Sequence, residues 1–151
     1  MSNASVVYEK ILSEIQTLFP EKSRIPYPYS LEDNQSHFLA NGYGLKVGSA
    51  EYEPLEFSNF VVARNIAVVV TREVFRTDSD EVVIDDIVKA LMDDIYVVQR
   101  KLYEMDATSG NSLQVIKVDV GSVSGVQTVT SSNSKFLSME AEFSFKITDS
   151  F

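Results

Sequence analysis

The chain has 151 residues, 44% of them hydrophobic, and its 13 Lys and Arg against 22 Asp and Glu give a net charge of −9. This length and apolar content predict one folded domain with an ordinary core and exclude global disorder. The acidic surplus disfavours a nucleic-acid clamp or an anionic membrane as partner, and the absence of cysteine removes disulfides, zinc–cysteine sites and thiol catalysis.

The first predicted element is a short amphipathic helix. Ser5 is placed to cap this helix and Pro20 to end it. From residue 21 to residue 42 the periodicity disappears, which predicts a long irregular loop of the kind that often carries function. The helix is recognised by apolar residues three and four apart: Val7, Ile11, Ile15, Leu18 and Phe19.

Two strands are predicted in the middle of the chain. Residues 41–48 combine an Asn-Gly turn signal with Tyr43, Leu45 and Val47 on one face, and their flanking glycines are expected to mark the ends of a short strand. Residues 61–75 are apolar on both faces through Ile66–Val70. We therefore expect the second strand to be central, with helix on one face and another layer on the other.

The longest predicted helix begins at Asp78, with Glu81 as its capping-box partner, and ends near residues 109–111. Its predicted core-facing stripe consists of Ile84, Ile87, Val88, Leu91, Ile95, Val98 and Leu102.

The C-terminal part returns to strand patterns. Residues 113–120 alternate as a strand, and the segment 121–135, rich in Ser, Thr and Gly, predicts a long loop or hairpin with a mobile tip. We expect an α+β fold in one domain, residues 1–151, with a mainly antiparallel sheet packed against one long helix and a short N-terminal helix. The closing strand is expected to point Leu137, Met139, Ala141, Phe143, Phe145 and Ile147 inward and Ser138, Glu140, Glu142, Ser144, Lys146 and Thr148 outward.

Catalytic, cofactor-binding and metal-binding residues are not predicted. His37 is the single histidine and has no orienting carboxylate beside it in sequence. Residues 121–125 do not match the nucleophile-elbow pattern. The glycines of Gly42-Tyr43-Gly44 are not followed by the Lys-Ser/Thr pair of a phosphate loop. The paired acids 85–86 and 93–94 are interpreted as solvated charge on a helix surface. The longest apolar run is too short to cross a bilayer, and residues 1–10 lack a secretory signal pattern, so we expect synthesis in a cytoplasm.

The order of these elements resembles tail terminator proteins of long-tailed bacteriophages, a group of tail completion and neck proteins. The resemblance covers nearly the whole chain and is carried by the helix ending at Pro20, the segment 41–48, the strand 63–72, the long helix and the strand 139–145. It implies a structural virion protein without catalytic residues. Six copies would form a ring that caps the tail tube and joins it to the head-side connector, assembled in the host cytoplasm, with DNA passing through unbound.

Two sets of residues are candidates for this role. Tyr27, Tyr29 and Tyr43 are predicted interface anchors, because aromatic side chains dominate interface energetics. An alternative function stays open, in which the acidic stretches make the chain a cytosolic adaptor for a basic protein. Acids expected to face the ring's channel, where like charge would let DNA slide, are Glu32, Asp33, Glu51, Glu53 and Glu56.

Overall fold

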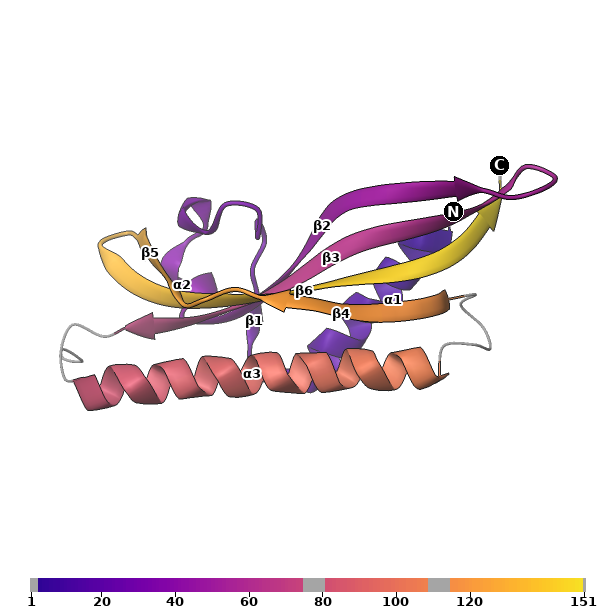
Figure 1. Ribbon diagram of the computed structural model, residues 1–151. Helices are drawn as coiled ribbons and strands as arrows, with labels where there is room; N and C mark the ends of the chain where they lie inside the picture. Colours follow the sequence, from indigo (N-terminus) through magenta and orange to yellow (C-terminus); the bar gives the residue numbers. More distant parts are fainter. Residues whose placement is uncertain (1–2, 75–80, 109–114, 151) are drawn as a thin grey trace.

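A computed structural model describes residues 3–74, 81–108 and 115–150, which build a mostly antiparallel six-stranded sheet with two helices packed on one face (Figure 1). The strand order is β1-β2-β3-β6-β4, and β5 also pairs with β6. Among the described strands, β1 and β2 are the one pair that runs parallel. The expected α+β class is therefore confirmed. The strands are β1 (Ser23–Arg24), β2 (Asn41–Pro54), β3 (Asn59–Val74), β4 (Val115–Val123), β5 (Gln127–Ser131) and β6 (Ser134–Ser150).

The two long helices follow their predicted apolar stripes. Helix α1 spans Asn3–Leu18, so Ser5 lies inside the helix instead of capping it, whereas the predicted stop before Pro20 is confirmed. Helix α3 spans Glu81–Thr108 in the described part of the chain. Its predicted cap at Asp78 and its predicted end at 109–111 lie outside the described residues.

The main core lies between these helices and the sheet. Leu91 and Ile95 of α3 pack with Phe143 and Phe145 of β6, and Ile87 is partly buried against the same cluster. All six residues of β6 that were expected to point inward are buried, because alternation along a strand places them on one face. Between the helices, Glu14 of α1 pairs with Lys101 of α3 at 3.1 Å.

A second, smaller core covers part of the opposite face. The chain between α1 and β2 folds into β1, the 3-10 helix η1 (Leu31–Asp33) and helix α2 (Ser36–Leu39), and its Ile25 and Leu39 pack on Val69 and Phe136. The second layer expected over the central strand is therefore confirmed, and it comes from the loop predicted at 21–42. Ser138, expected in solvent, is buried because it lies next to Phe136 on this covered face.

Two sequence-based boundaries are wrong. The strand predicted at 41–48 does not end at Gly48, because β2 continues to Pro54. Gly42, near the start of β2, is needed for close packing of the second layer, since an added Cβ there would stand 2.3 Å from the Phe38 carbonyl oxygen. The segment 121–135 is mostly strand, since β4 runs to Val123 and β5 pairs with β6 around a turn at Ser132 and Asn133. The hairpin interpretation of that segment is confirmed, but the long loop is not.

Candidate functional site

The hairpin that joins β2 to β3 projects from the body of the protein. The two strands pair from Asn41–Arg72 to Pro54–Phe60, with a bulge between Val47 and Ala50. In Figure 1 the hairpin loop reaches beyond the end of β6 and beyond the C-terminal end of α3. Beyond the Tyr52–Val62 pair, β2, β3 and β6 are the described strands that continue toward the tip, so the side chains there have fewer neighbours than those of the core.

Large apolar side chains are exposed on this hairpin. Phe57 at the tip is 90% exposed, Tyr52 is 61% exposed and Leu55 is 47% exposed; we call these three residues the hairpin patch. The centroid of the Tyr52 ring lies 5.5 Å from that of Phe60, so the two aromatic rings contact each other across the hairpin. Apolar side chains left in water do not stabilise a monomer, and exposed apolar patches often mark interaction sites. The hairpin patch is therefore a candidate contact surface.

The backbone at the hairpin tip adopts a conformation that favours glycine. Phe57 and Ser58 have φ angles of 58° and 63°, and the Leu55 amide closes the loop by donating to the Asn59 carbonyl at 2.8 Å. A left-handed conformation is uncommon for an aromatic residue and costs about 1 kcal/mol or more. The sequence thus keeps a phenylalanine at a position where glycine would be less strained and would expose less apolar surface.

The outer edge of β2 is partly covered near the second layer. Strand β1 pairs with Gly42 and Tyr43, and the Ile25 amide donates to the Tyr43 carbonyl at 2.8 Å. Further along, the Val47 amide donates to the hydroxyl of Tyr29 at 3.1 Å. Beyond Val47, no strand of the described chain pairs with this edge.

The opposite side of the sheet is also open. Strand β4 pairs with β6 along one of its edges, and no described strand lies along the other. The sheet therefore presents unpaired backbone groups on both of its sides, β2 at one and β4 at the other, within the residues that the structure describes.

The three predicted tyrosine anchors do not share one environment. Tyr27 and Tyr29 lie on the second layer, about half exposed, with their rings 5.8 Å apart. Tyr43 is only 3% exposed and packs near Phe19, with ring centroids 6.2 Å apart. The prediction of Tyr43 as a surface anchor is wrong, because alternation along β2 turns its side chain toward the helices.

The five predicted channel acids are all exposed, but they do not form one group. Glu51, Glu53 and Glu56 lie on the β2–β3 hairpin, whereas Glu32 and Asp33 lie in η1. Figure 1 places these two elements toward opposite ends of the molecule. The hairpin is therefore the place where acidic and exposed apolar side chains occur together.

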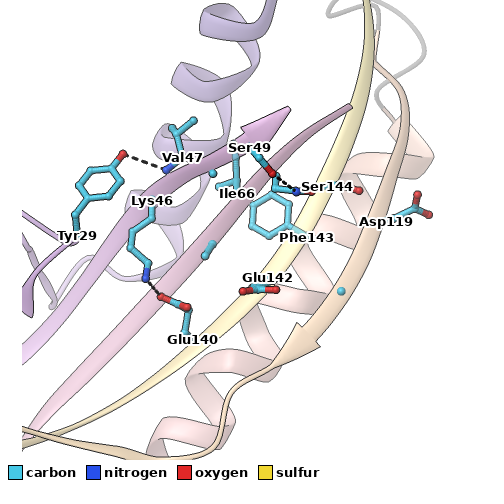
Figure 2. A pocket seen from close by; sticks show the side chains of 14 residues that line it. Tyr29, Lys46, Val47, Ser49, Ile66, Asp119, Glu140, Glu142, Phe143 and Ser144 are labelled. Carbon is cyan, nitrogen blue, oxygen red and sulfur yellow. Dashed lines mark hydrogen bonds and ion pairs between the residues drawn. The ribbon is translucent and has the colours of Figure 1, made fainter. Parts of the chain in front are cut away.

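An open cavity of about 450 Å³ lies on the sheet face opposite α1 and α3, in the part that the second layer does not cover (Figure 2). Lys46 of β2 and Glu140 of β6 form an ion pair across β3, above the small side chain of Ala67. Asp119 and Glu142 also line this cavity, so carboxylates outnumber ammonium groups in its wall.

A buried ion cluster that no sequence pattern predicts fastens the second layer to α3. The Lys22 ammonium, fully buried, donates to Asp94 at 3.0 Å and to the side-chain oxygen of Asn41. Arg72 donates to the same carboxylate through two nitrogens. Burial holds the pKa of Lys22 below its usual value of 10.5, although Asp94 acts in the opposite direction. Asp94 is therefore a structural ion-pair partner and not solvated charge.

The residues considered for catalysis lie apart from one another. His37 stacks on Phe38 with ring centroids 4.0 Å apart, and Ser124 exchanges hydrogen bonds with the backbone of Glu140. Within the described residues, His, Asp and Glu form no group of three able to hold a metal ion. None of the described helices is long and apolar enough to cross a membrane.

No family model matches the chain, and no curated protein matches its sequence.

Proposed function

We propose that the chain is a structural virion protein, a tail-terminator-like subunit that forms a hexameric ring on the tail tube and joins it to the head-side connector. The observation that supports this most is the pair of open edges, β2 on one side of the sheet and β4 on the other. The element order that resembles tail terminators agrees with it. The ring would assemble in the host cytoplasm and remain in the virion, with DNA passing through it.

Open edges on both sides allow the sheet to continue from one copy to the next. An unpaired strand is a template for another chain, and soluble monomers usually block long edges. A contact that joins β2 of one copy to β4 of the next is heterologous, and such contacts close into a ring when the rotation between copies permits.

The register of the hairpin identifies an amide that this contact would use. The Leu55 amide donates inward to Asn59, and neighbouring residues on a strand point their amides to opposite sides. Leu55 and Glu53 therefore point their amides toward β3, and Tyr52 points its amide toward the open edge. Proline at this position would remove one donor from the edge and leave the β2–β3 pairing in place.

Two variants of this residue test the proposal. We expect Tyr52→Pro to abolish ring formation, and Tyr52→Ala, which removes the same ring but keeps the amide, to assemble. Native mass spectrometry and electron microscopy, on the free chain and in the presence of tail tubes, would measure this. Equal assembly of the two variants would contradict the β2 edge as the contact.

The location in a virion needs a separate measurement. Immunogold electron microscopy of particles should label the head-proximal end of the tail, and absence of the chain from virions would overturn the proposal. The alternative adaptor function is favoured by the acids on the hairpin, Glu51, Glu53 and Glu56. An adaptor would stay monomeric or dimeric under all these conditions and bind a small basic protein.

A further inference from the structure

We propose that the tip of the β2–β3 hairpin is a docking surface for a different protein, one that offers an apolar pocket rimmed by Lys and Arg. Phe57 would enter the pocket, Tyr52 and Leu55 would cover its wall, and the hairpin acids would meet the basic rim. This inference does not depend on the ring, because the residues that carry it are side chains of the tip and the ring contact uses backbone edges.

The strain at Phe57 separates this surface from an ordinary exposed residue. A left-handed conformation at a bulky residue is uncommon and, when it occurs, is concentrated at functional positions. Phe57 is also the most exposed large apolar side chain of the described chain. Backbone strain and an exposed apolar ring both cost the isolated protein free energy, so we infer that the phenylalanine ring at position 57 serves a contact with a partner. Aromatic side chains that fill a pocket contribute much of the binding energy of an interface.

The charge of the hairpin defines the rim of the pocket. From Ser49 to Val62 the sequence contains three glutamates and no Lys or Arg. All three glutamates are exposed. Opposite charges around an apolar contact steer the encounter and reject wrong partners, so a basic rim is the complement of this tip.

The same charge argues against other occupants. Anionic lipid headgroups and nucleic-acid phosphates would be repelled by the glutamates. A second copy of this chain offers no match in its cavity at Lys46, because that ammonium already pairs with Glu140 and the wall holds further carboxylates from Asp119 and Glu142. A protein with a basic rim is therefore the partner that fits.

The test uses a defined probe, a fluorescent amphipathic helical peptide of Leu and Lys whose apolar stripe is rimmed by ammonium groups. We expect Phe57→Ser to weaken its binding about thirtyfold, the scale of a hot-spot residue. The matched control is Tyr103→Ser on α3, which removes a ring that is 71% exposed and should bind as the wild type does. Replacing the three hairpin glutamates by Gln should also weaken binding, and added salt should reduce the difference.

Further measurements make the outcome decisive. Amide chemical shifts of the labelled full chain should move at residues 51–58 on titration, and circular dichroism should show that all variants are folded. The proposal is overturned if Phe57→Ser binds the peptide like the wild type, or if a peptide with Glu in place of Lys binds equally well. It is also overturned if Phe57 instead mediates binding to lipid vesicles, or if Phe57→Ser abolishes self-association. Weakened peptide binding in Phe57→Ser together with normal self-association would separate this proposal from the proposed ring.

Discussion

Strand β3 passes through two regions with opposite surroundings. In the body of the protein, Val68–Thr71 are covered on both faces, by the helices on one side and by the second layer on the other. In the hairpin, Asn59–Val61 are half-buried or exposed, and the patch beside them faces solvent. The same continuous pairing with β6 supports both regions. Stability is therefore concentrated in the body, while the hairpin keeps its shape from the backbone and leaves the hairpin patch exposed.

The largest effect should come from the core. Phe143→Ala should cost about 3 to 5 kcal/mol of unfolding free energy, because it leaves a cavity under α3. Phe57→Ala, the same substitution at the exposed tip, should change stability by less than about 0.5 kcal/mol. Denaturant unfolding of both variants would check this, and similar losses would show that the hairpin is part of the cooperative core.

Removing the carboxylate of the buried ion cluster should have the next largest effect. Asp94→Asn leaves the buried Lys22 ammonium and Arg72 without their shared counter-charge, at a cost of about 3 kcal/mol. Asp93→Asn, at the exposed neighbouring position, is the control and should be nearly neutral. A small loss for Asp94→Asn, measured by thermal unfolding, would mean that water replaces the carboxylate.

The contact between the second layer and β2 can be tested at a glycine. Gly42→Ala places a methyl group against the Phe38 carbonyl oxygen and should cost about 1 to 3 kcal/mol. Gly48→Ala, beside the bulge of the same strand, meets its nearest atoms at 3.4 Å and should cost clearly less. Equal losses in chemical denaturation would indicate that strand propensity and not the second layer sets the requirement.

Alkaline pH should change the stability of the body through Lys22. Since burial lowers its pKa in the folded state, the unfolded chain binds more protons between that lowered pKa and 10.5. The unfolding free energy contributed by this group therefore rises with pH across that window. Lys22→Met should remove the rise, and a variant with the wild-type pH dependence would contradict it.

A small effect on stability is expected on the outside of the second layer. Tyr27 and Tyr29 are half exposed, so changing both to Ala should leave the unfolding free energy within about 1 kcal/mol while blocking ring assembly. Loss of the Tyr29 hydroxyl also frees the Val47 amide. Sedimentation velocity would measure assembly, and normal rings from the double variant would remove these residues from the interface.

The sequence predicted those parts of the fold whose burial follows a regular period. The stripes of both helices and the alternation of β6 are of this kind, because each position repeats the environment of the one three, four or two residues before it. The second layer could not be placed in this way, since Ile25 and Leu39 meet Val69 and Phe136 only through the fold. Tyr43 was correctly predicted to share a strand face with Leu45, but it was also predicted to be a surface anchor, and its burial shows that this second prediction is wrong.

The candidate site was less predictable than the core. Strand β2 continues past Gly48 through a bulge into polar residues, where no alternation marks a strand. The acids of the hairpin were recognised, but their neighbour Phe57 was not. A signal existed, because a large apolar residue within an acidic stretch has no core position that its local pattern would explain.

The position of β6 in the sheet also sets the order in which the protein can fold. This strand pairs with β3, β4 and β5, and all three are synthesised before it. Until β6 leaves the ribosome, the long apolar strand β3 lacks one of its neighbours, and the stripes of α1 and α3 lack the apolar side chains of β6 that they pack against. The nascent chain must therefore carry exposed apolar segments for most of its synthesis, a state that favours aggregation and chaperone binding.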